Sequence, residues 1–246
     1  MFDVHVITCL QTASRLPGIL RSIQRLINND QIKDIRLFCK SDIGFYSESN
    51  YTKQLWDYQI GKIYPLLAKN MQTISSRNID YLLGLLKMVP SQLFPSRKLK
   101  PAEKSLLAKH YQSLRSVVRT TLILEDDCHV REGCEELIVK CLDLCNSQDV
   151  YADLGCYEGL NGRGKLDIYN DFEYYHCKIA MTRTTSAFIL NPIVAKKLAS
   201  CYWPCSLPAD LHHQYLLLKE NISGIWPRNV LTSHLSAEGK VKSCIQ

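Results

Sequence analysis

The stretch TLILEDDCHV (121–130) places three consecutive acids, Glu125, Asp126 and Asp127, directly after an uninterrupted apolar run. The run is short and rich in residues that favour strands, as in a strand buried on both faces. Adjacent carboxylates repel one another unless water or a cation screens their charges. The pattern therefore predicts a buried strand that ends at a loop facing solvent or a ligand.

Strand and helix patterns alternate on both sides of this stretch. Short apolar segments predict further strands at 3–10, 34–40, 151–157, 176–181 and 186–191. Helical spacing and helix-start residues predict helices after Ser14 and at 101–118, 131–146, 192–200 and 208–221. This alternation is typical of an α/β fold with a central, mostly parallel sheet flanked by helices. In such sheets ligands bind beyond the carboxyl ends of the strands, which is where the three acids are expected.

Length and composition are those of an ordinary globular protein. The chain has 246 residues, of which 46% are hydrophobic and 22% charged, enough for a sizeable core. We expect a single domain over 1–246, with residues 45–98 as a helical or irregular insertion. No run approaches the roughly 18 apolar residues that span a bilayer. The segment YLLGLLKMV (81–89) is too short to cross one but could contact a membrane surface.

Charge and cysteine content narrow the possible partners. The formal net charge of +6 fits either a preference for anions or a solvated, lysine-rich surface. Lysine and arginine are scattered, with no basic stripe interleaved with aromatics, so nucleic acid is not an expected partner. The 11 cysteines include no C-x-x-C pair, and the N-terminus has no signal-peptide pattern. These features predict a reducing, cytoplasmic location.

The clustered acids have two interpretations. Mg²⁺ or Mn²⁺ binds one or two carboxylates together with water and phosphate oxygens, and such an ion would stabilise a departing nucleotide diphosphate. The alternative is a polar strand end that caps the next helix, and the three acids alone do not decide between the two. Because alternate residues of a strand point the same way, Glu125 and Asp127 are expected on one face and Asp126 on the other.

Other candidate residues also have a structural alternative. His110 lies among apolar helix residues, where a histidine that only packs is the default. Asp210 stands at a helix start and could serve there as a cap or dipole partner. His234, in a polar loop near the C-terminus, is either a further metal ligand or an exposed side chain. His212 and His213 are adjacent on a helix, point in different directions and make a poor pair of ligands.

Several motifs, in order along the chain, resemble glycosyltransferase family 25, the lipopolysaccharide and lipooligosaccharide glycosyltransferases related to collagen galactosyltransferases. The helix KPAEKSLLAKHY (100–111) resembles the family's G-E-x-G-C-x-x-S-H helix, with Glu103 and His110 at the Glu and His positions, and TLILEDD matches its LEDD strand. The segments that resemble other parts of the family are TASRLPGI (12–19), TRTTSAFILNPIVAKKLAS (182–200), LPADLHHQ (207–214), SHLS (233–236) and KVKSCIQ (240–246).

The resemblance implies a GT-A-like, nucleotide-sugar-binding fold, a divalent metal and a nucleotide-sugar donor. It implies that Asp127 is the leading metal and diphosphate contact, with Glu125 and Asp126 beside it and His234 as a further metal ligand. It also implies that Asp210 is the carboxylate that binds the acceptor or acts as a base. The residues implied to contact or shape the donor pocket are Arg15, Glu103 and His110.

The expected function is transfer of a sugar from a nucleotide sugar, such as UDP-galactose, to a glycan or lipid-linked oligosaccharide acceptor in lipopolysaccharide or cell-surface glycan synthesis. We expect a cytoplasmic enzyme that can associate with the inner face of the membrane. Two alternatives remain: another metal-dependent nucleotide or phosphate enzyme, and an inactive sugar- or nucleotide-binding member. The inactive-member alternative is based on Ser105, Leu106 and Lys109, which replace the Gly, Cys and Ser of the family's helix motif.

Overall fold

The computed structural model of the chain describes residues 1–27, 32–39, 99–155, 165–177, 182, 184–203, 205, 207–236 and 239–240. The predicted insertion at 45–98, with its apolar segment 81–89, lies outside the described residues. So do residues 178–181 of a predicted strand and 241–246 of the C-terminal motif. In the part of the chain that is described, no helix has the length and apolar character needed to span a membrane.

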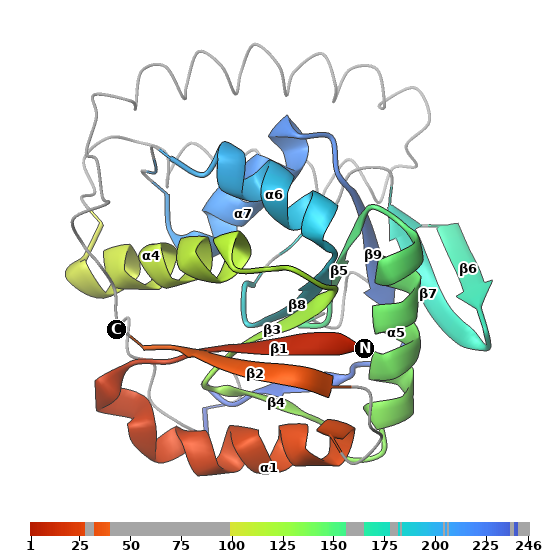
Figure 1. The fold of residues 1–246 in the computed structure, drawn as a ribbon, viewed down its shortest axis with the longest axis horizontal. Helices are drawn as coiled ribbons and strands as arrows, with labels where there is room; N and C mark the ends of the chain where they lie inside the picture. Colours follow the sequence, from red (N-terminus) through yellow and green to blue (C-terminus); the bar gives the residue numbers. More distant parts are fainter. Residues whose placement is uncertain are drawn as a thin grey trace.

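The described residues form an α/β structure, as the alternating pattern predicts (Figure 1). The elements in chain order are β1 (Phe2–Ile7), the 3-10 helix η1 (Leu10–Arg15), α1 (Leu16–Ile27), β2 (Ile32–Phe38), α4 (Pro101–Arg115), β3 (Thr121–Glu125), β4 (Cys128–Val130), α5 (Glu135–Ser147), β5 (Val150–Asp153), β6 (Lys165–Tyr169), β7 (Phe172–Cys177), β8 (Ala187–Leu190), α6 (Pro192–Ser200), α7 (Ala209–Lys219), β9 (Ser223–Pro227) and β10 (Thr232–His234).

Eight strands form the central sheet, in the order β2-β1-β3-β8-β5-β9-β7-β6. The half that contains the acids is parallel, because β1 pairs in parallel with both β2 and β3. Beyond β3 the sheet is mixed: β8 runs antiparallel to β3 and to β5, while β5 and β9 are parallel. The expected α/β class with a central sheet flanked by helices is confirmed.

Helices cover both faces of this sheet, and Figure 1 shows α1 and α4 on opposite sides of it. Successive residues of β3 point to opposite faces, as strand geometry requires. Leu122 and Leu124 pack with side chains of α1 and α5, whereas Ile123 packs with α4, α6 and α7. All three are fully buried. The uninterrupted apolar run before the acids is therefore explained by burial on both faces.

The hairpin of β6 and β7 was not predicted from the sequence. Its two turn residues, Asn170 and Asp171, both have positive φ, at 47° and 62°, as in the two-residue turns that match the twist of a hairpin. Asn and Asp are among the few residues that adopt this conformation readily. The Asn-Asp pair between two β-rich segments was thus the sequence signal for this hairpin. The predicted strand 176–181 overlaps only the end of β7.

A second, two-stranded sheet extends the acid turn. β4 begins at Cys128, directly after Asp127, and pairs antiparallel with β10, which ends at His234. The backbone N–H of Leu235 donates to the carbonyl of Asp127 at 2.8 Å. The ribbon of β4 and β10 thus brings Asp127 and His234 together, although they are 107 positions apart in the sequence.

Candidate functional site

The turn that carries the acids is fixed by the backbone on both sides. The N–H of Glu125 donates to the carbonyl of Ser186 at 2.8 Å, and the N–H of Asp126 donates to the carbonyl of Ile7 at 2.9 Å. The acids therefore lie at the carboxyl ends of the adjacent strands β1 and β3, as predicted. Each of the three side chains then takes a different direction and a different set of partners.

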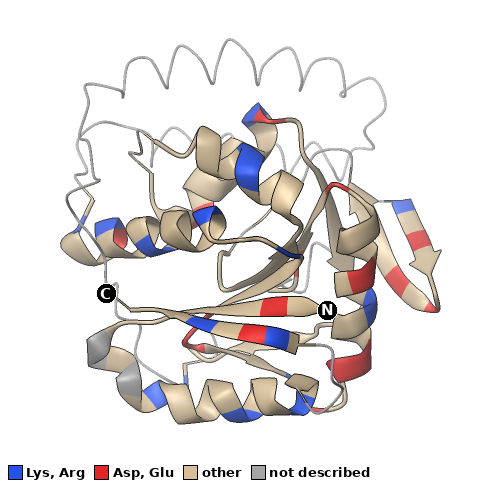
Figure 2. Ribbon diagram, viewed as in Figure 1, with Lys and Arg blue, Asp and Glu red and all other residues tan. Residues whose placement is uncertain are grey.

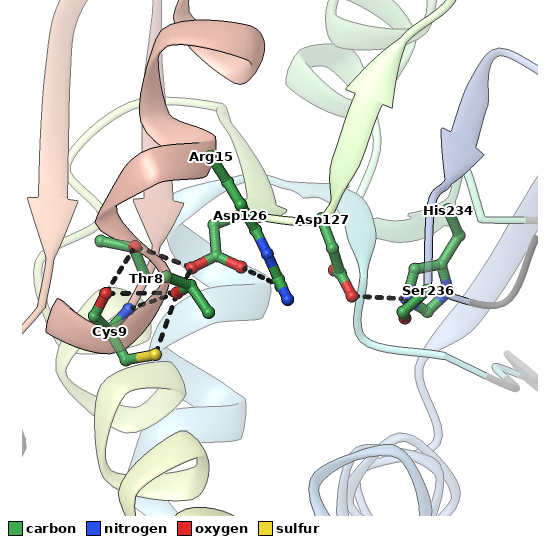
Figure 3. A network of polar contacts seen from close by, with 8 residues as sticks. Thr8, Cys9, Arg15, Asp126, Asp127, His234 and Ser236 are labelled. Atoms are coloured by element: carbon green, nitrogen blue, oxygen red, sulfur yellow. Dashed lines mark hydrogen bonds and ion pairs between the residues drawn. The ribbon is translucent and has the colours of Figure 1, made fainter. Parts of the chain in front are cut away.

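Asp126 holds the loop after β1 in place (Figure 3). Its Oδ2 accepts hydrogen bonds from the hydroxyls of Thr8, at 2.7 Å, and Thr12, and its Oδ1 lies 3.1 Å from Nη1 of Arg15. The side chains of Asp126 and Arg15 are only 7% and 14% exposed. We call these four residues the Asp126 clamp. Both carboxylate oxygens of Asp126 are bound within the chain, so its contacts are those of a structural residue that positions Arg15.

Asp127 faces the opposite way, toward the end of β10 (Figure 3). Its Oδ2 lies 3.3 Å from Nε2 of His234, which in turn lies 3.0 Å from Oγ of Ser236. Its Oδ1 is buried and has no hydrogen-bond partner among the described residues. We call Asp127, His234 and Ser236 the Asp127 edge. In contrast to the Asp126 clamp, it keeps one carboxylate oxygen available to a ligand.

The Asp127 carboxyl is held in its charged form despite its burial. Desolvation, the largest influence, raises the pKa of Asp127. The hydrogen bonds from His234 and Ser236 and the charges of His234 and Arg15 together outweigh it, so the pKa lies below its usual value. The carboxylate is therefore charged, and its buried Oδ1, which has no partner among the described residues, makes Asp127 the best placed of the three acids to bind a cation.

Glu125 belongs to a third environment, on the α4 side of the sheet. Its Oε1 accepts from the hydroxyl of Thr185 at 2.6 Å and lies 3.1 Å from Nε2 of His110. The expectation that Glu125 and Asp127 share one face is wrong in this respect, because β3 ends at Glu125 and Asp127 lies in the turn that follows. Strand alternation applies only while the strand continues.

The predicted metal ligands are therefore brought together only in part. Asp127 and His234 meet, but Glu125 binds His110 and Thr185 instead. Across the described residues, no three His, Cys, Asp or Glu side chains form a group suited to a metal ion. Carboxylate oxygens suit Mg²⁺ and Mn²⁺, whereas imidazole is more typical of zinc, copper, iron and nickel sites. Mg²⁺ completes its shell with water and phosphate oxygens. The unpartnered Oδ1 of Asp127 fits such a two-ligand site.

Asp210 lies in the first turn of α7 and is partly buried. Burial raises the pKa of Asp210, and the negative charges of Glu125 and Glu103 raise it further against the opposing backbone hydrogen bond of Leu211. A carboxylate with a raised pKa is a better proton acceptor. Asp210 thus lies within electrostatic reach of Glu125, and its role as a base stays a prediction. Pro208 takes the N-cap position of α7, but the hydrogen bond from Leu211 gives Asp210 a contact at the helix start, as the structural alternative expects.

Glu103 and the histidines have mainly structural contacts. Oε2 of Glu103 accepts the backbone N–H of Lys100 at 2.7 Å and so caps α4. His212 and His213 point to different partners, as predicted: His212 contacts the carbonyl of Tyr202 at 2.8 Å, and the ring of His213 lies 5.0 Å from that of His110. His110 is fully buried and also contacts Glu125, and its role in a donor pocket stays a prediction.

Sequence reasoning missed the hydroxyl partners of the acids. Thr8, Thr12, Thr185 and Ser236 each contact an acid or the histidine bound to it. Three of them stand inside the segments that carry the family resemblance, TASRLPGI, TRTTSAFILN and SHLS, and this was the available signal. The contacts themselves span 60 residues or more in three of the four cases, so local patterns could not reveal them.

Comparisons with known proteins do not define a family. No protein-family profile matches the chain, and no curated protein has detectable sequence similarity to it. A crystal structure of apo UDP-glucose pyrophosphorylase is similar at 9% sequence identity and a TM-score of 0.46, over 98% of this chain and 96% of that one.

Proposed function

We propose that this chain is a metal-assisted glycosyltransferase that moves a hexose from a nucleotide sugar, such as UDP-galactose, to a glycan acceptor. The observation that carries the proposal is the Asp127 edge. A charged, buried carboxylate shares His234 with Ser236 and keeps Oδ1 without a partner among the described residues, at the carboxyl end of β3. The motifs that resemble those of glycosyltransferase family 25 support the same assignment.

A divalent ion bound by Asp127 and His234 would neutralise the diphosphate of the donor and stabilise it as a leaving group. Arg15, which the Asp126 clamp holds in place, adds a fixed positive charge beside the same turn. Positive charge near a departing phosphate stabilises the transition state most when it is already positioned. The clamp therefore orients Arg15 toward the donor.

Asp210 serves as the base in this proposal. The acceptor hydroxyl oxygen bonds to the anomeric carbon as the bond from that carbon to the diphosphate breaks, and the hydroxyl proton passes to the Asp210 carboxylate. The raised pKa of Asp210, caused by burial and then by the charges of Glu125 and Glu103, suits this role. We further propose that the acceptor is lipid-linked and that the enzyme works in the cytoplasm at the membrane surface.

The proposal is tested by incubating the purified full-length protein with a panel of nucleotide sugars, with and without Mn²⁺, and measuring nucleotide diphosphate release. We expect release from one donor that requires metal and is lost in Asp127→Asn. Asp143→Asn is a matched control, because Asp143 is an exposed carboxylate on α5. Metal-dependent turnover of phosphate compounds without any sugar nucleotide would instead support the alternative phosphate enzyme.

A further inference from the structure

A basic cavity lies next to the acid turn, between α1 and the β4–β10 ribbon. Its volume is about 430 Å³, and its walls include Arg21 and Arg25 of α1, His129 of β4, Arg131 and Ser233. We call it the arginine cavity. Ligand pockets usually measure about 300 to 1,000 Å³, so the cavity can take a group the size of a phosphorylated sugar. It is separate from the Asp127 edge, and the proposed reaction assigns it no role.

The lining of the arginine cavity carries three guanidinium groups and a single carboxylate, that of Glu132. Figure 2 shows the basic residues that recur along α1. Arg25 is fixed as part of the wall, because it pairs with Glu135 and donates to the carbonyl of Val130 at 3.1 Å. The side chains of Arg21 and Arg131 are exposed, and neither pairs with a carboxylate among the described residues. Two arginines are thus available to an anionic ligand.

His129 adds a polar group to the wall of the cavity. Nε2 of His129 is buried and has no partner among the described residues. The His129 ring lies so close to α1 that a Cβ on Gly18 would come within 2.9 Å of its Cε1. Glycine at this position therefore permits α1 to approach the ribbon. A buried imidazole nitrogen without a partner is costly unless a ligand or water binds it.

The cavity also lies within reach of the proposed reaction centre. Arg15, which ends η1, contacts Asp126, and Arg21 follows six residues later, about 9 Å along a helix axis. On the other wall, His129 stands two residues after Asp127, about 7 Å along a strand. One ligand could therefore place one group in the cavity and another at the Asp127 edge.

We propose that the arginine cavity binds a phosphate group on the glycan acceptor. This proposal rests on the proposed glycosyltransferase function, because that function places the donor diphosphate at the Asp127 edge and leaves the cavity to the second substrate. Guanidinium groups bind phosphate through paired hydrogen bonds that match its geometry. Arg21 and Arg131 supply these, with His129 and Ser233 as further hydrogen-bonding partners. The acceptor is accordingly a phosphorylated saccharide rather than a neutral one.

The first experiment measures binding of galactose 1-phosphate, inorganic phosphate and galactose to the full-length protein by calorimetry. We expect both phosphates to bind and galactose not to bind. The double variant Arg21→Gln/Arg131→Gln should weaken phosphate binding about tenfold or more, since each charge-assisted contact contributes substantially. The matched control is Arg36→Gln/Arg228→Gln, which removes the same charge from two partly exposed arginines elsewhere. Equal losses in both double variants would overturn the proposal.

Two further measurements are needed. One distinguishes a lipid phosphate from a sugar phosphate, and the other distinguishes failure of the phosphate site from failure of the proposed glycosyltransferase function. Vesicles with and without anionic phospholipid test a lipid headgroup. If Arg21→Gln/Arg131→Gln loses vesicle binding but keeps galactose 1-phosphate binding, the cavity is a membrane contact and the acceptor proposal is wrong. Donor binding, followed by thermal shift with the nucleotide sugar, should be unchanged in the same variant. Phosphate binding that needs Arg21 and Arg131 in a protein that binds no nucleotide sugar would overturn the proposed function and retain the phosphate site.

Discussion

The Asp126 clamp and the Asp127 edge begin at adjacent residues and differ in how completely their polar atoms are used. In the clamp, both oxygens of Asp126 are bound by Thr8, Thr12 and Arg15. In the edge, Asp127 shares only Oδ2 with His234, and Oδ1 is buried without a partner among the described residues. Buried polar groups are nearly always paired when their role is to stabilise the fold. The comparison therefore supports a structural role for Asp126 and the proposed ligand-binding role for Asp127.

The largest expected effect is on the Asp127 edge. Asp127→Asn removes the charge that would hold the cation but keeps nearly the same shape. We expect metal-dependent diphosphate release to fall about a thousandfold or more, because metal stabilisation of the leaving group contributes several kcal/mol. Thermal stability at neutral pH should fall, but by less than in Asp126→Ala, because the lowered pKa of Asp127 means that folding favours its charged form. Activity is followed by diphosphate release and stability by a melting curve, and a variant that is fully active but unstable would reverse the assignment.

Asp210 gives the next largest effect and extends the comparison to a third carboxylate. Asp210→Asn should slow transfer to the acceptor by about 10² to 10⁴, the usual contribution of a positioned base. Donor binding should remain, which a thermal-shift assay with the nucleotide sugar can show.

Because burial raises the pKa of Asp210 above its unfolded value, folding favours the protonated form, and stability falls as pH rises from the unfolded pKa through the folded one. Asp210→Asn lacks this charge and should be the more stable protein at neutral pH, with the difference disappearing below the unfolded pKa. Chemical denaturation at pH 3 and pH 7 tests this, and an equal difference at both would contradict the assigned shift.

The Asp126 clamp should show the opposite behaviour to Asp127. Asp126→Ala leaves the two threonine hydroxyls and the Arg15 charge without their common carboxylate. We expect a loss of about 3 kcal/mol in the free energy of unfolding, near the value for breaking a largely buried pair. Urea denaturation measures the loss, with Asp143→Ala as the exposed control. Affinity for the nucleotide sugar should fall only to the extent that Arg15 is displaced by the loss of Asp126.

The fold was largely predictable because its signals are local. The apolar run of β3 predicts a strand buried on both faces. Asn191 caps α6, and Pro192 is the first residue of that helix. The roles of the three acids were not predictable, because they depend on where β3 ends. Had β3 continued through Asp127, that side chain would have pointed to the same face as Glu125. The partners that distinguish the acids, such as Thr8 and His234, lie more than 100 residues away.

The hairpin of β6 and β7 was missed in the sequence for a different reason. Its turn residues Asn170 and Asp171 are a local signal, so the sequence contained the information. The strand β6 that precedes them is exposed along most of its length and lies at the edge of the sheet. Without burial it lacks a continuous apolar pattern, which is the signal that sequence analysis uses first.

The smallest expected effect concerns His213, whose ring nitrogens are buried without partners among the described residues. Burial, and then the charges of His110 and His212, hold the pKa of His213 well below its usual 6.5. The unfolded chain therefore binds a proton that the folded chain does not, and stability falls as pH drops below 6.5, by up to about 1.4 kcal/mol per pH unit.

His213→Phe should reduce this pH dependence and cost little at pH 8, since no hydrogen bond to a described residue is lost. Urea denaturation at pH 8, 6.5 and 5.5 measures the slope. The matched variant is His212→Phe, because burial lowers the pKa of His212 to about 4 while the residue also contacts the carbonyl of Tyr202. This variant should lose stability at every pH. If His213→Phe instead behaves like His212→Phe, then His213 has a structural partner, and an unpaired buried polar group does not by itself mark a functional position in this protein.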